Sequence, residues 1–334
     1  MSYRLTTPAG SYLLQRINHR VFPDIVGLSA NIRQVTDHIR ARIATAGGEA
    51  AQQLTLRLVP TLAGEDYHQD DEGNYWRMFD FLEGLLAYDF VETPEQAYAG
   101  ARSFGYFLCF LSDFPPERIV PVLPDFHNVV YRLNAFNLAR MPTKYAGGGA
   151  QVQRMLAERK KQCAPDIARA LALSAGLTDL QHAWEAGKLP TRVTHNDTKF
   201  NNVLLSPEGQ GKAVVDLDTV MPGIVHFDFG DGIRTATATA TEDEADLGLV
   251  GVDPEKYRAF QEGYLSVTHD VLTPAEHHYL PRSGALLAYI MGVRFLTDYL
   301  LGDTYYGAKY PGHNLVRARN QLRLAEVLRA FSRG

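Results

Sequence analysis

The stretch THNDTKFNNVLL, residues 194–205, decides how this sequence is interpreted. Its polar residues follow one order: His195, one residue, Asp197, one residue, Lys199, two residues, Asn202. The apolar residues after Asn202 begin a predicted hairpin, FNNVLLSPEGQGKAVVDLD, which turns at a Pro-Glu-Gly-Gln-Gly segment. A carboxylate, an ammonium and an amide group are therefore gathered directly ahead of a predicted strand.

The spacing of this segment is that of a known catalytic loop. In protein kinases the loop reads HRDxxxxN, and the interval from Asp197 to Asn202 is the same. Phosphoryl transfer from ATP needs a carboxylate that orients and deprotonates the attacking hydroxyl, ligands for magnesium, and positive charge near the transferring oxygens. We therefore expect Asp197 to be the base, Asn202 a metal ligand, and Lys199 a cation near the γ-phosphate.

A second metal ligand is expected where the returning strand of the hairpin ends, beside Asn202. That position is Asp216 in AVVDLDT. The chain also contains the triplet DFG, in which Asp holds magnesium in protein kinases, but its Asp228 lies past the hairpin. We expect Asp216 to hold the metal, and Asp228 to be buried and to fix the catalytic loop through hydrogen bonds.

The rest of the chain changes texture near residue 85. Before it, a hairpin about Pro-Ala-Gly, one helix-like run and the strand-like runs LTLRLVP (54–60) and NYWRMFDFL (74–82) indicate a small β lobe. After it helices dominate, with a joint at the glycines of 147–149. We predict an α+β, protein-kinase-like two-lobed fold: a small nucleotide-binding lobe over residues 1–84 and a larger, mainly helical lobe over residues 85–334.

Composition limits the partners. The formal net charge is −5 and no long basic run occurs, so nucleic acid and anionic membrane surfaces are not expected partners. The two cysteines lack the spacing of a metal or redox site. No segment reaches about 18 unbroken apolar residues, and the first residues lack a signal-peptide pattern. We expect a cytoplasmic monomer or weak homodimer that acts on a small molecule.

Several segments resemble one family, in the same order along the chain. They are RVTHNDTKFNNVLL, VVDLDTVMPG, FDFGDGIR, GVRFLTDYLLGDTYY and KYPGHNLVRAR. The chain resembles the aminoglycoside phosphotransferase-like superfamily, and most closely the N-acetylhexosamine 1-kinases. The likeness runs from about Tyr12 to about Arg323. The resemblance implies a kinase of carbohydrate metabolism that uses ATP and Mg²⁺ to phosphorylate the anomeric hydroxyl of N-acetylglucosamine or N-acetylgalactosamine.

The resemblance also implies roles for particular residues. Asp197 would be the base, Asn202 and Asp216 would bind the metal, and Arg294 and Tyr305 would face the sugar. A neutral amino sugar needs directional hydrogen bonds and an apolar or aromatic face, and we expect two further residues near the same cleft, Asp231 and Arg234. The hinge strand is expected to offer backbone groups to adenine from Phe79, Asp80, Phe81 and Leu82.

The small lobe departs from the usual pattern. Kinase-like lobes open with a glycine-rich hairpin over the phosphates, followed by a strand whose lysine pairs with them. Here nothing glycine-rich precedes Tyr3, and the strand SYLLQRIN carries Gln15 and Arg16 at the place of the lysine. Either the start is misassigned or trimmed, or part of the nucleotide cover is lost. Two alternatives stay open: a kinase for another small alcohol, such as an aminoglycoside or choline, and a sugar-binding pseudokinase.

Overall fold

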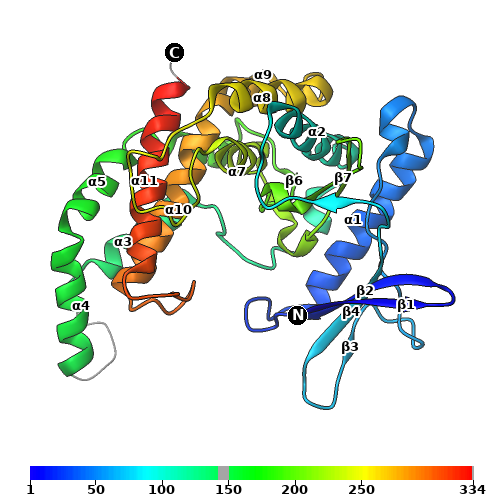
Figure 1. Ribbon diagram of the computed structural model, residues 1–334, viewed down its shortest axis with the longest axis horizontal. Coiled ribbons are helices and arrows are strands. Elements are labelled where there is room, and N and C mark those ends of the chain that lie inside the picture. Colours follow the sequence, from blue (N-terminus) through cyan, green and yellow to red (C-terminus); the bar gives the residue numbers. More distant parts are fainter. Residues whose placement is uncertain (142–149, 333–334) are drawn as a thin grey trace. The chain divides into compact units, whose positions relative to one another are not determined.

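A computed structural model of the 334-residue chain describes residues 1–141 and 150–332. The joint predicted at 147–149 lies outside these residues. The chain forms two compact units (Figure 1). Unit 1 comprises Met1–Pro124, Pro190–Asp228 and Glu255–Thr273, and unit 2 comprises Asp125–Leu189, Phe229–Pro254 and Pro274–Gly334. These units are not continuous in sequence, unlike the predicted lobes, and the lobe boundary at residue 84 stays a prediction.

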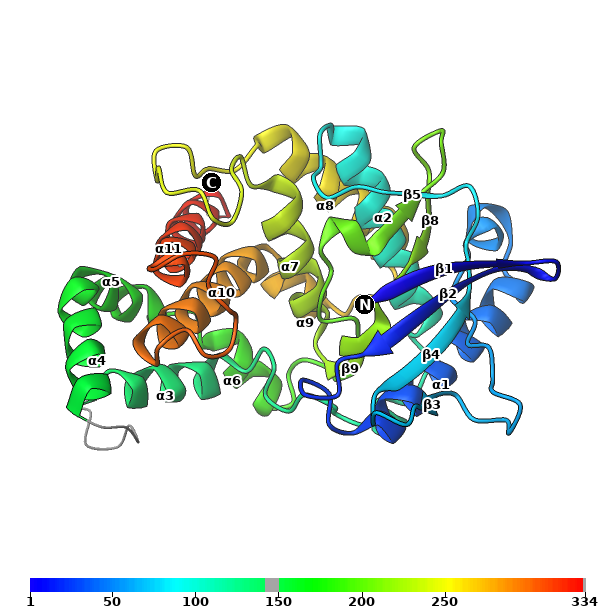
Figure 2. The ribbon, with the colours of Figure 1, turned by 60° about the horizontal axis from the view of Figure 1, so that its bottom comes forward.

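Unit 1 opens with an antiparallel sheet in the order β1-β2-β4-β3 (Figure 2). Its strands are β1 (Ser2–Thr7), β2 (Gly10–Ile17), β3 (His68–Gln69) and β4 (Tyr75–Asp80). The predicted hairpin about Pro-Ala-Gly is confirmed, because β1 pairs with β2 across that turn. In the central pair, Gln15 of β2 lies opposite Arg77 of β4. This register places two polar side chains next to each other across the sheet.

The strand predicted over residues 54–60 does not form as a regular strand. Its two ends pair with different partners: the amide of Leu54 donates to Lys212 at 2.7 Å, and that of Val59 donates to Met78 at 2.8 Å. Only isolated bridges therefore form along it, and the proline at position 60 has no amide to extend the ladder.

Helix α1 (Ile25–Thr45) belongs to the same unit. Asp24 caps it by accepting the amide of Gly27 at 2.8 Å. Residues three and four apart form its buried stripe, which includes Leu28, Ile32 and Val35, all fully buried. Each such side chain contributes roughly 1.5–3 kcal/mol to the stability of the fold.

The remaining elements of unit 1 surround a short hairpin. They are β5 (Leu86–Ala87), α2 (Pro94–Phe110), β6 (Arg192–Thr194), β7 (Val203–Leu205), β8 (Gly211–Val214), β9 (Met221–Gly223), the start of α7 (Val225–Thr237), α8 (Pro254–Thr268), and the 3-10 turns η1 (Gly48–Gln52), η2 (Pro116–Arg118), η4 (Phe200–Asn202) and η5 (Leu217–Thr219). The pairing of β7 with β8 confirms the predicted hairpin. Helix α2 packs closely on the start of this hairpin, because a Cβ at Gly100 would overlap the Phe200 ring.

Unit 2 is built around α10 (Ser283–Leu300), whose side chains are almost all buried. Helix α11 (His313–Phe331) runs beside α10, and α3 (Val129–Ala139), α4 (Ala150–Gln162) and α5 (Ala164–Ser174) also pack on it (Figure 1). The unit also holds α6 (Asp179–Glu185), α9 (Pro274–Tyr279) and η6 (Leu280–Arg282). Among the described residues, no helix has the length and apolar character needed to cross a membrane.

Candidate active site

The loop between β6 and η4 carries the predicted catalytic residues, and Asp228 fixes its backbone. The Asp228 carboxylate accepts the amide of His195 at 2.9 Å and the amide of Asn196 at 2.7 Å. The Thr198 hydroxyl donates to the Asp228 carbonyl at 2.6 Å. Asn196 is left-handed, with φ of 64°, a conformation that Asn tolerates better than most residues. The expectation that a buried Asp228 would fix this loop is confirmed.

His195 fastens the loop to the end of β8. Its ring is fully buried, with Phe104 and Phe107 against it. Nδ1 accepts the amide of Asp197 at 3.2 Å, and Nε2 lies 2.9 Å from the carbonyl of Val215. Because Nδ1 accepts, the proton sits on Nε2 and is donated to that carbonyl. His195 is therefore a structural residue that positions Asp197.

Asp197, Lys199 and Asn202 meet in one polar group. The Asn202 amide nitrogen donates to the Asp197 carbonyl at 2.7 Å and to Asp197 Oδ2 at 3.3 Å. Lys199 Nζ lies 3.0 Å from the same Oδ2. Asp197 Oδ1 accepts no hydrogen bond within the described residues, and the side chain is 27% exposed. One carboxylate oxygen is thus held by the protein while the other is open to an acceptor molecule.

Asp216 follows β8 on the other arm of the hairpin. The amide of Val215 donates to the carbonyl of Asn202 at 2.9 Å, so the two arms are joined where the predicted metal ligands stand. Asp216 is left-handed, with φ of 61°, which turns the chain immediately after the strand. Burial raises the pKa of its carboxyl group, and the charges of Asp218 and Asp197 raise it further. Lys199 lowers the pKa, but burial and the two neighbouring carboxylates outweigh it, so this environment favours a bound cation.

The oxygen atoms of Asn202 and Asp216 suit a hard cation. The Asn202 amide nitrogen is engaged by Asp197, which leaves Oδ1 as the ligand atom. No group of three or more His, Cys, Asp or Glu side chains within residues 1–141 and 150–332 could hold a metal by itself. Mg²⁺ is usually bound by one or two carboxylates together with substrate phosphates and water. The two residues therefore fit Mg²⁺ that arrives with a nucleotide.

Arg77 is the residue that sequence reasoning missed. Its Nε and Nη2 donate to Gln15 Oε1 at 3.2 and 3.1 Å, and its Nη1 donates to Asp218. The Arg77 side chain is 5% exposed. The cation next to the aspartates thus comes from β4, whereas β2 carries Gln15 at the place expected for a lysine. The segment WRMFD contained a signal for this role. Its arginine lies two positions before Phe79, on the buried face of the strand.

The predicted adenine-binding residues differ in whether their backbone amides already donate a hydrogen bond within the protein. The amide of Asp80 donates to Arg57 at 3.1 Å and that of Phe81 to Ser11 at 3.0 Å, while Phe79 is buried within the sheet. The amide of Leu82 makes no hydrogen bond in the described part of the chain. Of the four residues, Leu82 is the one with a backbone donor open to a ligand.

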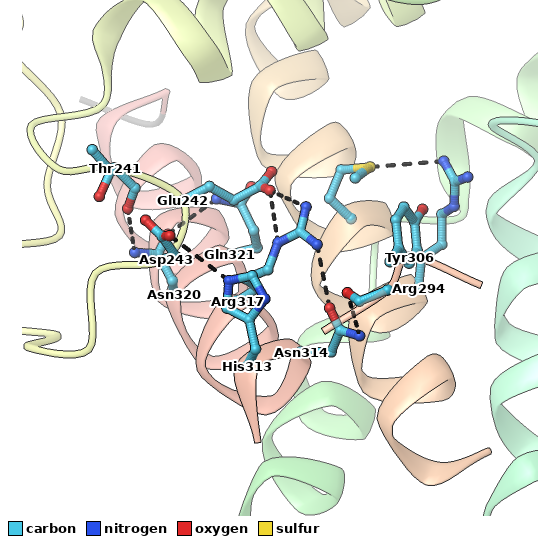
Figure 3. A network of polar contacts seen from close by, with 12 residues as sticks. Thr241, Glu242, Asp243, Arg294, Tyr306, His313, Asn314, Arg317, Asn320 and Gln321 are labelled. Carbon is cyan, nitrogen blue, oxygen red and sulfur yellow. Dashed lines mark hydrogen bonds and ion pairs between the residues drawn. The ribbon is translucent and has the colours of Figure 1, made fainter. Parts of the chain in front are cut away.

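Arg234 and Asp231, predicted near the sugar, form a buried pair in unit 2. Arg234 donates to Asp231 Oδ1 through Nε at 3.0 Å and through Nη2 at 2.6 Å. Its Nη1 lies 3.0 Å from Gln321 and 3.4 Å from Glu242, two residues that are drawn in Figure 3. This pair connects α7 with α11, and its contact with a sugar stays a prediction.

Arg294 and Tyr305, the other predicted sugar residues, are linked through α10. The Asp298 carboxylate accepts the amides of Thr304, Tyr305 and Tyr306 at 2.8–3.0 Å, which fixes the segment after the helix. Tyr305 is 61% exposed, whereas Arg294 is only 8% exposed. The structure brings the helix of Arg294 and the segment of Tyr305 together, and sugar contact by either side chain stays a prediction.

Residues 2–260 match the family model described as the phosphotransferase enzyme family. The chain is also similar to solved structures. An aminoglycoside phosphotransferase from Alicyclobacillus acidocaldarius is 15% identical, with 99% of this chain and 90% of that chain covered and a TM-score of 0.58. A microcompartment-associated aminopropanol kinase is 15% identical, with 99% of this chain and 90% of that chain covered and a TM-score of 0.55. An amicoumacin kinase in complex with AMP-PNP, Ca²⁺ and Ami is 13% identical, with 97% of this chain and 85% of that chain covered and a TM-score of 0.54.

These likenesses show the fold. The chain has a kinase-like α+β fold, with a small β-sheet lobe at its N-terminal end and a larger helical lobe, which confirms the predicted fold class.

Proposed function

We propose that this chain, which belongs to the phosphotransferase enzyme family, transfers the γ-phosphate of ATP to the anomeric hydroxyl of an N-acetylhexosamine, either N-acetylglucosamine or N-acetylgalactosamine. One observation carries the proposal: Asp197 has one carboxylate oxygen held by Lys199 and Asn202 and the other open. Phosphoryl transfer needs an anchored carboxylate of this kind to orient the attacking hydroxyl. The choice of acceptor is supported by the resemblance to the N-acetylhexosamine 1-kinases.

Asp197 would act on the acceptor through Oδ1. In the proposed reaction this oxygen accepts the hydrogen bond of the sugar hydroxyl and takes its proton as the phosphoryl group is transferred. Lys199 holds Oδ2 and places a positive charge beside the reacting group. His195 and Asp228 keep the loop rigid, so the carboxylate is already oriented when the sugar binds.

Mg²⁺ would be held by Asn202 Oδ1 and the Asp216 carboxylate, together with phosphate oxygens. When bound, the metal supplies charge neutralisation at the phosphates. The raised pKa of Asp216 supports this role, because burial and two neighbouring carboxylates oppose its ionisation. Among the similar structures, the amicoumacin kinase contains AMP-PNP and Ca²⁺.

The nucleotide and the sugar would use residues outside the loop. We propose that adenine is bound at the hinge, chiefly by the backbone of Leu82, and that Arg294 and Tyr305 contact the sugar. Contacts by Asp231 and Arg234 remain part of the proposal. The cytoplasmic location and the monomeric or weakly dimeric state also remain proposals.

Kinases of other small alcohols are the competing function. The aminopropanol kinase and the aminoglycoside phosphotransferase have acceptors with amino groups in their names. A cationic acceptor favours a carboxylate-lined site. The buried guanidinium of Arg294 has no carboxylate partner within the described residues, which supports a neutral or anionic acceptor instead.

The test is ATP- and Mg²⁺-dependent ADP release with N-acetylglucosamine, N-acetylgalactosamine, kanamycin and choline, using the wild type and Asp197→Asn. We expect turnover with the hexosamines that falls by roughly 10²–10⁴ in the variant, and a phosphorus NMR signal of a sugar 1-phosphate. Turnover with kanamycin or choline alone would show that the acceptor is an amine-bearing alcohol and not an N-acetylhexosamine. Saturable sugar binding without ADP release would identify a pseudokinase.

A further inference from the structure

Two arginines of unit 2, Arg132 and Arg294, both contact Phe126, and neither has a carboxylate partner within the described residues. The guanidinium of Arg294 lies 4.7 Å from the centre of the Phe126 ring and 5.3 Å from that of Tyr306. Arg132 of α3 donates to the Phe126 carbonyl at 2.9 and 3.2 Å. Arg132, Arg294 and the Tyr306 hydroxyl are called the donor cluster below.

Arg294 differs sharply from its neighbour Arg317, although both lie against the Tyr306 ring, at 5.3 and 5.5 Å. Arg317 donates to the Glu242 carboxylate and to Asn314, whereas the one hydrogen bond that Arg294 makes within the described residues goes to the Met291 sulfur at 3.7 Å (Figure 3). Arg294 is nonetheless 8% exposed. A buried guanidinium normally has a carboxylate or carbonyl partner, because an unpaired buried charge is strongly destabilising.

Arg132 and Tyr306 extend the same imbalance. Burial lowers the pKa of Arg132, and the positive charge of Arg294 lowers it further. Burial raises the pKa of Tyr306 to about 12, so its hydroxyl keeps its proton. That hydroxyl is buried and has no hydrogen-bond partner within the described residues. Glu242 is the carboxylate whose charge acts on Tyr306, and it already pairs with Arg317 and Arg234.

Two cations with no carboxylate partner, and one buried hydroxyl with no acceptor, within the described residues favour a bound anion. Arg presents its donors in a planar fork that matches the two oxygens of a carboxylate. The neutral acetyl group of a plain N-acetylhexosamine would satisfy one donor and leave the two positive charges uncompensated. A carboxylate would satisfy donors and charge together.

We propose that the donor cluster binds a carboxylate of the acceptor, and that the preferred acceptor is an acidic amino sugar: an N-acetylhexosamine that carries a carboxylic acid. This inference rests on the proposed function and deepens it, since it names the class of sugar. Arg294 is then an anion-binding residue, with Arg132 and Tyr306 as further determinants of specificity.

The test compares acceptors that differ in one carboxylate: N-acetylglucosamine, N-acetylmuramic acid, which adds a lactic acid ether, and N-acetylglucosaminuronic acid, which has an acid at C6. The variants are Tyr306→Phe and Arg132→Met. Tyr306→Phe is the cleaner one, because it removes a hydroxyl that makes no hydrogen bond to any described residue. Tyr289→Phe is the matched control, since its hydroxyl donates to Ala170 at 3.0 Å.

We expect kcat/KM to be about tenfold or more higher for at least one acidic sugar than for N-acetylglucosamine, the size of a hydrogen bond to a charged group. Both cluster variants should erase most of that preference, and Tyr289→Phe should lower Tm while leaving it intact. Equal kcat/KM for neutral and acidic sugars, or a preference that survives both variants, would overturn the inference.

Calorimetric binding of the same sugars without ATP separates this inference from the proposed function. Binding of an acidic sugar that is weakened by Tyr306→Phe, in a chain that releases no ADP, would support the donor cluster and refute the kinase. ADP release with neutral sugars, with no added affinity for acidic ones, would support the kinase and refute the cluster.

Discussion

The Asp228 carboxylate lies 2.7 Å from the amide of Asn196, the left-handed residue that precedes Asp197. A helix residue thereby holds the backbone of the predicted catalytic loop. The same carboxylate also accepts the neighbouring amide of His195. A negatively charged group that accepts two backbone amides contributes more than a neutral one would.

Asp228→Asn should therefore destabilise the protein. The new amide group must place a donor against one of the two backbone donors, which leaves that amide without an acceptor. We expect a loss of about 2–4 kcal/mol in the free energy of unfolding, measured by urea denaturation. Asp71→Asn, in an exposed turn, is the control and should change it by less than about 0.5 kcal/mol. An unchanged midpoint for Asp228→Asn would show that the loop is held by other contacts.

The Arg77–Asp218 pair predicts a coupling between β4 and the segment after β8. Arg77→Met leaves Asp218 without its partner, and we expect a loss of about 2–4 kcal/mol in stability. The double variant Arg77→Met, Asp218→Asn should recover part of this loss. A double-mutant cycle on unfolding free energies measures the coupling, and additive effects would mean that the pair contributes little.

Asp216 should make the thermal stability of the protein depend on magnesium. Its pKa is raised in the fold, so the protonated form contributes stability below the ordinary value of 3.8, and this contribution is lost as the pH rises through the folded value. At pH 7 without metal, Asp216→Asn should thus have a Tm equal to or above that of the wild type. Adding MgADP should raise the Tm of the wild type and not that of the variant. Equal shifts in both proteins would remove Asp216 from the metal site.

The two cysteines should be unreactive in the folded protein. Burial raises the pKa of both Cys109 and Cys163 to about 11, so the reactive thiolate is scarce at pH 8. We expect labelling by a thiol reagent to be slow under native conditions and complete within minutes in denaturant. Fast native labelling of either residue, identified by mass spectrometry, would contradict the burial seen here.

Local sequence patterns predicted much of the loop and hairpin. Asn202 precedes β7 and Asp216 follows β8, two strands that pair across one turn, so their approach follows from spacing alone. The burial of Asp228 was expected as well, and every residue from 223 to 234 around it is buried.

Other contacts join segments with no common pattern. Arg77 and Asp218 are 141 positions apart, and their pairing depends on how the sheet and the hairpin pack. The donor cluster likewise takes Arg132 and Tyr306 from distant parts of the chain, so no window of sequence contains it. Arg234 also illustrates the limit: its type suggested a ligand contact, but only the structure shows how many of its donors are already engaged.

Asp298 has a consequence for how tightly a ligand can bind. By accepting three successive amides, it immobilises the segment of Tyr305 and Tyr306 on the helix that carries Arg294. The conformational entropy of that segment is therefore lost when the chain folds, and little remains to be lost when a ligand arrives. For the proposed sugar acceptor, the Tyr305 and Tyr306 side chains would form a preorganised surface, and its affinity would not depend on ordering a loop.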